Sequence, residues 1–287
     1  MSDDELQRYY DRNTDLFLRI GSSGPGHAIH RGLWGPGVRN GREAAEYVNG
    51  LIAGRTRDCL PREPRALLDL GCGVGGTLFS LARTFSGAHL HGVTISARQV
   101  SIARELAQRK GLGERCAFVQ ADFEDLDLDL RVDAIIAVES FIHSSRPERL
   151  LATCRRHLVA DGVLVIVDDF LAHPFPAEDP ALRETIDTFR TGWRVPGLCT
   201  LADLDTLARR AGLEPLETQD LSRLIRTGRP RDWLVAMVSP PARAMGLTRR
   251  PFWANVVGGN ALNTALRSGW IQYQLLALRP AAPDGPP

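Results

Sequence analysis

The chain has 287 residues, 44% of them hydrophobic and 24% charged, a composition that excludes collagen-like, coiled-coil and disordered proteins. This length allows one large domain with additions or two domains. The formal net charge of +1, from 35 basic and 34 acidic residues, gives no overall electrostatic footprint for nucleic acid or an anionic membrane.

Targeting and metal-binding signals are absent from the sequence. The five cysteines stand far apart without a Cys-x-x-Cys pair, so neither a disulfide framework nor a zinc site is expected. The acidic N-terminus lacks the apolar core of a signal peptide, and no stretch approaches the ~18 apolar residues of a membrane-spanning helix. We therefore expect a cytoplasmic protein with a small-molecule substrate, no metal, no nucleic acid and no membrane partner. The sequence leaves a homodimer open.

Along the chain, a helix over residues 3–18 precedes a loop rich in turn formers, which carries His30 and Trp34. From residue 42, short apolar runs alternate with helical segments. Such alternation indicates βαβ units, and hence an α/β fold with a Rossmann-like, doubly wound, mostly parallel sheet. The expected parallel strands are residues 65–70, 88–94, 117–120, 132–138 and 163–167.

The C-terminal part has a looser pattern. Helices are expected at 179–190 and 200–211, and strands at 216–221 and 271–278, the last strand being antiparallel. The predicted divisions are a helix and cover loop (1–41), a core (42–221), a helical lid insertion (222–268), the last core strand (269–280) and a disordered tail (281–287).

A glycine-rich turn follows the first predicted strand and opens a helix. Glycines let the backbone turn tightly and approach a ligand at the carboxyl edge of a sheet. The spacing Gly71-x-Gly73-x-x-Gly76 also matches the dinucleotide fingerprint, so taken alone it leaves an NAD(P) oxidoreductase open. It also leaves open a turn that merely closes the junction between strand and helix.

Three strand ends bear on this choice. The carboxylate of Asp69 suits a cationic ligand group and is awkward beside a pyrophosphate. The second strand ends Gly92-Val93-Thr94-Ile95-Ser96 with Gln99 one turn later, so only neutral groups stand where an NAD site has an acidic ribose ligand. At the third strand end, Asp122 can accept a hydrogen bond from an exocyclic amine and Phe123 can stack on a purine.

Together, these segments resemble a class I S-adenosylmethionine-dependent methyltransferase over about residues 40–170. The Thr-Ile-Ser-x-x-Gln pattern is similar to the branch with cyclopropane fatty acid synthases, tocopherol methyltransferases and C-methyltransferases of prenyl and indole substrates. Tyr9-Tyr10-Asp11 and His30-Arg31-Gly32-Leu33-Trp34 also resemble the N-terminal cover of that branch.

The resemblance implies S-adenosyl-L-methionine as cofactor and S-adenosyl-L-homocysteine as product. It places Asp69 near the methionine amino group, the backbone after it along the amino acid moiety, Gln99 with its neighbours at the ribose, and Asp122 with Phe123 at the adenine. The expected cofactor residues are Tyr10, Asp69, Gly71, Cys72, Gly73, Thr94, Ile95, Gln99, Asp122, Phe123 and Glu139.

The fourth strand ends in Glu139-Ser140-Phe141-Ile142-His143, which puts Glu139 and His143 toward the reaction centre. Methyl transfer needs alignment and exclusion of water, and the protein then adds a proton acceptor. His143 is the candidate base, with a histidine bonded to backbone as the alternative. Glu139 could hold the substrate, neutralise a cation or orient the loop.

Aromatic residues in loops are the candidates for lining a substrate chamber, because an aromatic face stabilises a carbocation by roughly 0.5–2 kcal/mol. The sequence favours C-methylation of an indole or prenyl-type carbon of a small apolar specialised metabolite, with or without cyclisation. N- or O-methylation and a cofactor-binding cyclase are the alternatives. The expected substrate residues are Tyr9, His30, Trp34, Phe141 and Trp193.

Two charged clusters are assigned no role at this stage. Arg223, Arg226, Arg229 and Arg231 could grip a diphosphate, although a solvated loop is the simpler interpretation in a chain so rich in arginine. The pair Asp168-Asp169 stands where catechol methyltransferases hold a metal, but no matching acidic set follows it.

Overall fold

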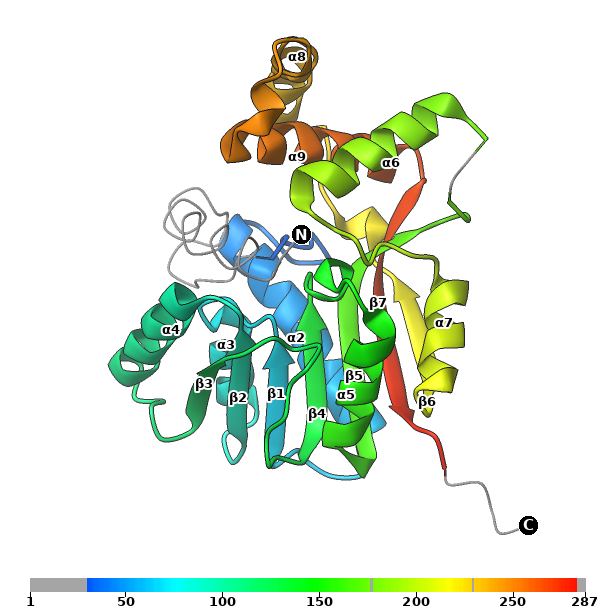
Figure 1. The fold of residues 1–287 in the computed structure, drawn as a ribbon. Coiled ribbons are helices and arrows are strands. Elements are labelled where there is room, and N and C mark those ends of the chain that lie inside the picture. Colours follow the sequence, from blue (N-terminus) through cyan, green and yellow to red (C-terminus); the bar gives the residue numbers. More distant parts are fainter. Residues whose placement is uncertain (1–29, 176–177, 229, 283–287) are drawn as a thin grey trace, which may run out of the picture.

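The computed structural model describes residues 30–175, 178–228 and 230–282, and shows one seven-stranded sheet in the order β3-β2-β1-β4-β5-β7-β6 (Figure 1). β1 to β5 run parallel, and β7 lies antiparallel between β5 and β6. The predicted fold class, including the antiparallel last strand, is confirmed. The strands are β1 (Ala66–Leu70), β2 (His89–Thr94), β3 (Cys116–Gln120), β4 (Val132–Val138), β5 (Leu158–Leu171), β6 (Leu213–Asp220) and β7 (Ile271–Pro280).

Helices cover both faces of the sheet, so both faces are buried. Side chains of successive strand residues point to opposite faces and therefore pack against different helices. In β1, Leu67 packs against the layer of α2, α3 and α4, whereas Leu68 packs against the layer of α5 and α7. These near-continuous apolar strands are what made the parallel sheet predictable. The covering helices are α2 (Gly41–Cys59), α3 (Gly76–Thr84), α4 (Ala97–Arg109), α5 (Pro147–His157) and α7 (Leu201–Arg210).

Above the strand ends lies a separate helical layer, which we call the lid (Figure 1). Its helices are α6 (Pro180–Trp193), α8 (Pro230–Ala244) and α9 (Pro251–Arg267). Ile186 and Phe189 of α6 are buried in one cluster with Leu262 of α9. A Cβ at Gly192 would lie 2.7 Å from the Cα of Gly258, so α6 and α9 cross at a distance that only glycine permits. The lid is thus built from residues before and after β6.

Short 3-10 turns complete the described chain: η2 (Phe141–His143), η3 (Ser222–Leu224) and η4 (Leu247–Arg249). No helix in the described ranges is long and apolar enough to cross a bilayer. The helix expected at 3–18 and most of the expected tail lie outside the described residues.

Candidate active site

The carboxyl ends of β1, β2 and β4 meet at one edge of the sheet, below the lid. Leu70 of β1 pairs with Val93 of β2 and with Ala137 of β4, so the segments that follow these strands start side by side. The sequence-predicted cofactor and catalytic residues come from these segments and from the end of β3.

The glycine-rich turn after β1 requires its glycines. Gly71, Gly73 and Gly75 have φ angles of 76°, 55° and 86°, in the left-handed region that side chains disfavour. A Cβ at Gly71 would lie only 2.6 Å from the Cβ of Ser140, so the turn after β1 contacts the end of β4 directly. The amides of Gly71 and Cys72 both donate to the carbonyl of Val93 at 2.9 Å, which fixes the turn to β2.

Asp69 is a buried acid. It is 3% exposed and accepts no hydrogen bond from the described part of the chain, and burial raises its pKa to about 7. The hydroxyl of Ser140 is likewise buried, with no partner among the described residues. A buried carboxyl and hydroxyl that lack partners are costly unless a ligand completes them. An amino group with positive charge fits this part of the edge.

Thr94 and Gln99 form a buried pair at the end of β2. The Thr94 hydroxyl donates to the side-chain Oε1 of Gln99 at 2.6 Å. The Ser96 hydroxyl caps α4 by accepting from the backbone amide of Gln99 at 3.1 Å. The side-chain nitrogen of Gln99 then has no acceptor among the described residues, so it can donate to a ligand hydroxyl. Ile95 beside this pair is half-buried.

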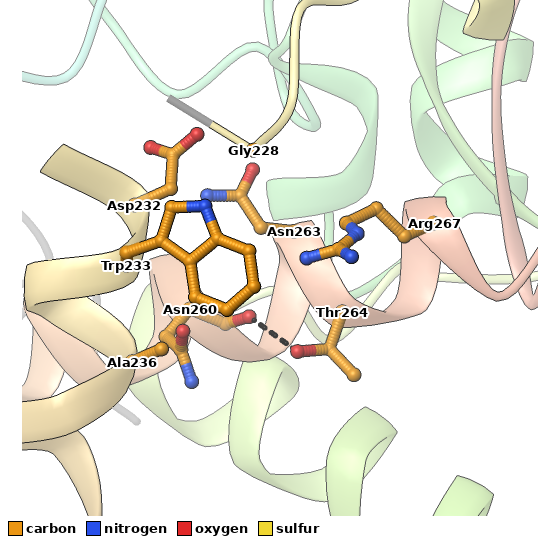
Figure 2. A pocket seen from close by; sticks show the side chains of 8 residues that line it. All are labelled: Gly228, Asp232, Trp233, Ala236, Asn260, Asn263, Thr264 and Arg267. Atoms are coloured by element: carbon orange, nitrogen blue, oxygen red, sulfur yellow. Dashed lines mark hydrogen bonds between the residues drawn. The ribbon is translucent and has the colours of Figure 1, made fainter. Parts of the chain in front are cut away.

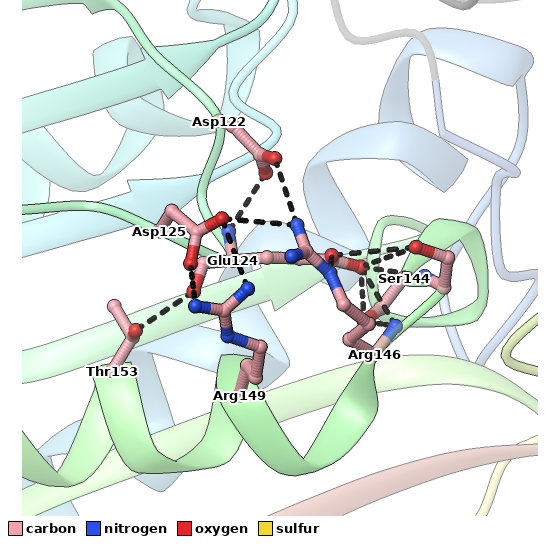
Figure 3. A network of polar contacts seen from close by, with 8 residues as sticks. Asp122, Glu124, Asp125, Ser144, Arg146, Arg149 and Thr153 are labelled. Carbon is pink, nitrogen blue, oxygen red and sulfur yellow. Dashed lines mark hydrogen bonds and ion pairs between the residues drawn. The ribbon is translucent and has the colours of Figure 1, made fainter. Parts of the chain in front are cut away.

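Asp122 belongs to a polar network that joins the end of β3 to the start of α5 (Figure 3). Its Oδ1 accepts from the Glu124 amide at 2.8 Å, and its Oδ2 lies 3.5 Å from Nη2 of Arg146. Glu124 accepts from Nε of Arg146 at 2.6 Å. The network fixes the backbone that carries Phe123, whose ring lies 3.8 Å from the Cβ position of Gly71.

Glu139 lies at the centre of a second, buried network. Its Oε1 accepts from the backbone amide and from Nε of Arg31, at 2.9 and 3.0 Å, and from the Tyr273 hydroxyl at 2.9 Å. Arg31 also donates from Nη2 to Asp169 at 2.7 Å, and its guanidinium lies 4.3 Å from the centroid of the Tyr273 ring. Glu139 has a φ of 49°, a strained conformation that these bonds hold.

The three carboxyl groups near Arg31 differ in how readily they ionise. Burial is the largest single effect on Glu139 and opposes its ionisation, but the charge of Arg31, the hydrogen bonds that Arg31 donates and the neighbouring His30 together lower the pKa of this carboxyl. Burial raises the pKa of Asp169, and burial together with Asp169 raises that of Asp168 well above its ordinary value. The site therefore holds a carboxylate at Glu139 and a permanent cation at Arg31.

No sequence motif predicts a role for Arg31 or Tyr273. Arg31 lies 108 residues from Glu139 and Tyr273 lies 134 residues from it, so no local pattern connects them. The pair Asp168-Asp169 stands out in the sequence, but nothing in the sequence indicates that Arg31 is the partner of Asp169. In the described ranges, no group of three His, Cys, Asp or Glu side chains is arranged to hold a metal ion.

His143 ends η2 under the lid. Its Nδ1 lies 3.1 Å from the carbonyl oxygen of Arg194, the residue after α6. A carbonyl only accepts, so Nδ1 carries the proton and Nε2 is the basic nitrogen of the neutral ring. Burial lowers the pKa of His143, against an opposing effect of the Arg194 carbonyl and the Glu139 charge, and keeps the imidazole neutral at pH 7.

His30 and Trp34 belong to the same segment as Arg31, which joins the Glu139 network. His30 is 7% exposed; its Nδ1 lies 3.0 Å from the Arg31 carbonyl, and its buried Nε2 has no partner among the described residues. Trp34 carries the Arg226 guanidinium 3.5 Å from its ring centroid. One face of this indole is thus occupied by a cation, so at most the other is available to a substrate.

The other proposed substrate residues take part in packing. Phe141 is 1% exposed and stacks on Phe170, with ring centroids 6.1 Å apart. Trp193 packs on Phe189 at 5.7 Å and donates its Nε1 to the Asn255 carbonyl at 3.1 Å, which ties α6 to α9. Tyr9 and Tyr10 lie outside the described residues.

A hollow between α8 and α9 lies in the lid (Figure 2). None of its lining residues comes from a strand end or from the cofactor and catalytic residues predicted from the sequence. Its lining residues are Gly228, Asp232, Trp233, Ala236, Asn260, Asn263, Thr264 and Arg267.

Comparison with known proteins places this geometry in a family context. A family model described as a methyltransferase domain matches residues 67–162. The chain is 32% identical over 224 residues to the O-methyltransferase cnsE of Penicillium expansum, covering 77% of this chain and 76% of that protein. It is 30% identical to the 27-O-demethylrifamycin SV methyltransferase of Amycolatopsis mediterranei, covering 77% and 78%.

A further relative is longer than this chain. The 24-methylenesterol C-methyltransferase 2 of Oryza sativa is 29% identical over 219 residues, which are 76% of this chain but only 58% of that protein. Among solved structures, the mycolic acid cyclopropane synthase CmaA1 has a TM-score of 0.74 at 20% identity, covering 97% of this chain and 98% of that one. The cyclase SpnF has a TM-score of 0.72 at 24% identity, covering 98% and 97%. At these identities the structures share the fold.

Proposed function

The chain belongs to the S-adenosylmethionine-dependent methyltransferases of small molecules, and from this premise we propose that it methylates a hydroxyl oxygen of a small, largely apolar specialised metabolite. The observation that carries the proposal is His143: a neutral imidazole, held by a carbonyl at Nδ1, at the edge where the strands end. A hydroxyl acceptor must lose a proton as it is methylated, and such an imidazole can take it.

S-adenosyl-L-methionine is the cofactor, and when bound it supplies a methyl group on a positively charged sulfur. The residues present fit it. Asp69 would pair with the amino group, since this buried acid has no cationic partner among the described residues. The amide nitrogen of Gln99 would donate to a ribose hydroxyl, and Phe123 would stack on the adenine beside Asp122. The proposed contribution of Tyr10 concerns a residue outside the described ranges.

In this proposal His143 and Glu139 have different catalytic roles. Nε2 of His143 accepts the hydroxyl proton while the oxygen takes the methyl group, and the carboxylate of Glu139 stabilises the imidazolium that results. Arg31 is a positioning residue, because it keeps Glu139 ionised and fixed in its strained conformation. Burial under the lid excludes water, which strengthens each of these interactions.

Carbon methylation is the second candidate, and two observations bear on it. The sterol relative is named a C-methyltransferase, and the ionised Glu139 could neutralise a carbocation formed on an indole or prenyl-type carbon. The aromatic support expected for such a cation is limited, however. Phe141 is buried, Trp193 packs within the lid and Trp34 already faces Arg226. These placements favour oxygen.

The test is incubation with methyl-labelled S-adenosyl-L-methionine and a panel of matched acceptors that differ only in carrying a free hydroxyl, a blocked hydroxyl or an unsubstituted indole or alkene carbon. We expect label only in the free hydroxyl compounds. Label in the blocked compounds would overturn the oxygen assignment in favour of carbon. An acceptor rearranged without gain of label would identify a cyclase instead.

A further inference from the structure

Exposed large apolar side chains gather on the outer part of the lid. Among the described residues seven such side chains are exposed, and six of them lie between positions 233 and 252. The seventh is Leu216 on β6, at 37% exposure. The six are Trp233 (61%), Leu234 (61%), Met237 (71%), Val238 (40%), Met245 (70%) and Phe252 (50%).

The side chains of α8 in this set form one stripe. Residues at positions 233, 234, 237 and 238 share a helical face, because neighbours at i, i+3 and i+4 lie on the same side. Ser239, on the opposite face, is 3% exposed. Figure 1 shows α8 at the end of the molecule farthest from the sheet, beyond α9. Leu234, Met237 and Val238 are therefore exposed to solvent, whereas Trp233 stands at the edge of the stripe and also lines the hollow between α8 and α9.

The same segment concentrates positive charge. Residues 222–268 contain eight arginines and a single acidic residue, Asp232, which gives a formal charge of +7. The whole chain carries +1, so the remaining residues together carry −6. Of these arginines, Arg223, Arg226, Arg250 and Arg267 are exposed. The net charge of +1 is therefore the sum of a cationic segment, residues 222–268, and an acidic remainder, which we call the body.

We propose that this face of the lid, defined by the apolar stripe of α8 with Met245, Phe252 and the flanking arginines, docks reversibly on an anionic lipid bilayer. Exposed Trp, Phe, Leu and Met beside guanidinium groups is the composition of segments that lie in a membrane interface. The apolar side chains enter the acyl boundary, and the arginines pair with anionic headgroups.

Shape and charge favour this occupant over others. The stripe is the convex side of a protruding helix rather than a groove, and a bilayer receives such side chains without a complementary cavity. Two copies joined through this face would bring together two segments, residues 222–268 of each copy, that carry +7 each. Two copies joined lid to body would form a heterologous contact that need not close. The acidic body faces away when the lid lies on an anionic surface.

This orientation also bears on the proposed function. Since the lid covers the strand ends, docking would bring the active site toward the bilayer, from which an apolar acceptor could enter. That consequence rests on the proposed function, whereas docking itself does not, because it is measured without cofactor or acceptor.

The test is co-sedimentation of the full chain with vesicles of phosphatidylcholine alone or mixed with phosphatidylglycerol. We expect binding to the mixed vesicles only, weakened by salt. The double substitution Leu234→Glu with Met237→Glu should weaken binding at least about tenfold, since it removes apolar contacts and adds like charge at an anionic surface. Leu216→Glu, the exposed apolar residue outside the lid, is the matched control and should bind as the wild type does.

A charge variant tests the second half of the proposal. Arg250→Gln with Arg267→Gln should weaken binding by about tenfold or more, because each cation near an anionic surface contributes to attraction. Arg109→Gln, an exposed arginine of α4, serves as its control. Unchanged melting temperature and cofactor affinity would show that each variant is folded.

Three results would overturn the proposal. The first is no sedimentation of the wild type with anionic vesicles at low salt. The second is equal binding by the wild type and the Leu234→Glu, Met237→Glu variant. The third is a concentration-dependent dimer that this variant abolishes without any vesicle binding, which would assign the face to a second copy of the chain.

Discussion

The sheet edge and the outer lid depart from the usual distribution of side chains in opposite directions. At the sheet edge, Asp69 and Asp169 are buried acids and Glu139 is 16% exposed, and of these three only Glu139 and Asp169 share a cation, Arg31. On α8, large apolar side chains are exposed. Soluble proteins normally do the reverse, so each departure marks a surface that a ligand or partner completes. At the sheet edge we propose the charged cofactor, and at the lid we propose a bilayer.

Arg31 provides the largest test of this contrast. Arg31→Gln leaves Glu139 and Asp169 buried without their cation, so we expect the free energy of unfolding to fall by about 3–5 kcal/mol. Arg39→Gln, which breaks an exposed pair with Glu43, should cost far less, because water screens this pair. Denaturant unfolding measures both. Equal losses would mean that the buried network is no more important than a surface ion pair.

His143 tests whether the edge does chemistry. Replacing it with Gln should lower turnover by about 10²- to 10³-fold, because it removes the proton acceptor. Cofactor affinity, measured by calorimetry, should stay within about twofold, since the ring contacts Arg194 and not the glycine turn. His173→Gln, at an exposed position, is the control. A large loss of cofactor affinity in His143→Gln would place the residue in the cofactor site instead.

Removing the carboxylate of Asp69 should change cofactor affinity and protein stability in opposite directions. Asp69→Asn should weaken cofactor binding by roughly 10- to 100-fold, since it removes a charge-assisted contact with the amino group. Without ligand the same variant should be more stable than the wild type at pH 8, because it removes a buried charge. Glu105→Gln, in an exposed surface pair on α4, should change neither quantity.

The pH dependence follows from the sign of the shift. The folded pKa of Asp69, about 7, lies above its unfolded value, so its contribution to stability is complete at acidic pH and is lost as the pH rises toward 7. The stability gain of Asp69→Asn should therefore vanish toward pH 4. Cofactor affinity should behave oppositely and fall below about pH 7, where the carboxyl is protonated. A cofactor affinity that does not change with pH would contradict the proposed contact between Asp69 and the amino group.

The lid should give the smallest effect. Leu234→Glu with Met237→Glu should change the free energy of unfolding by no more than about 0.5 kcal/mol per site, because both side chains are already in water. Thermal melting measures this. A loss of several kcal/mol would show that the stripe packs against part of the chain, and would remove the contrast with the sheet edge.

The predictable part of the site is the part encoded by neighbouring residues. Asp69, the glycines after it and Gln99 stand at fixed positions relative to strand ends, and hydrophobic runs locate those ends. Arg31 could not be assigned in this way, because its role depends on partners 108 and 138 residues away. The same holds for the contact of Trp34 with Arg226, which takes one face of the ring.

Two further features, the charge of one segment and the extent of the lid, could not be predicted from the sequence as a whole. The net charge of +1 predicted no contact with an anionic membrane, although residues 222–268 carry +7. The lid insertion was placed at 222–268, but α6 lies in the same layer because Ile186 and Phe189 face α9. That pairing is a tertiary contact, and the spacing of apolar residues in α6 shows only that one face is buried, not against what.

The most direct test of the central claim is transfer of a trideuterated methyl group from S-adenosyl-L-methionine to a panel of small apolar acceptors, followed by mass spectrometry. The account predicts a product heavier by one trideuteriomethyl group on an oxygen, formed by the wild type and strongly reduced in His143→Gln. Cofactor binding without transfer to any acceptor, or equal transfer by wild type and His143→Gln, would contradict it.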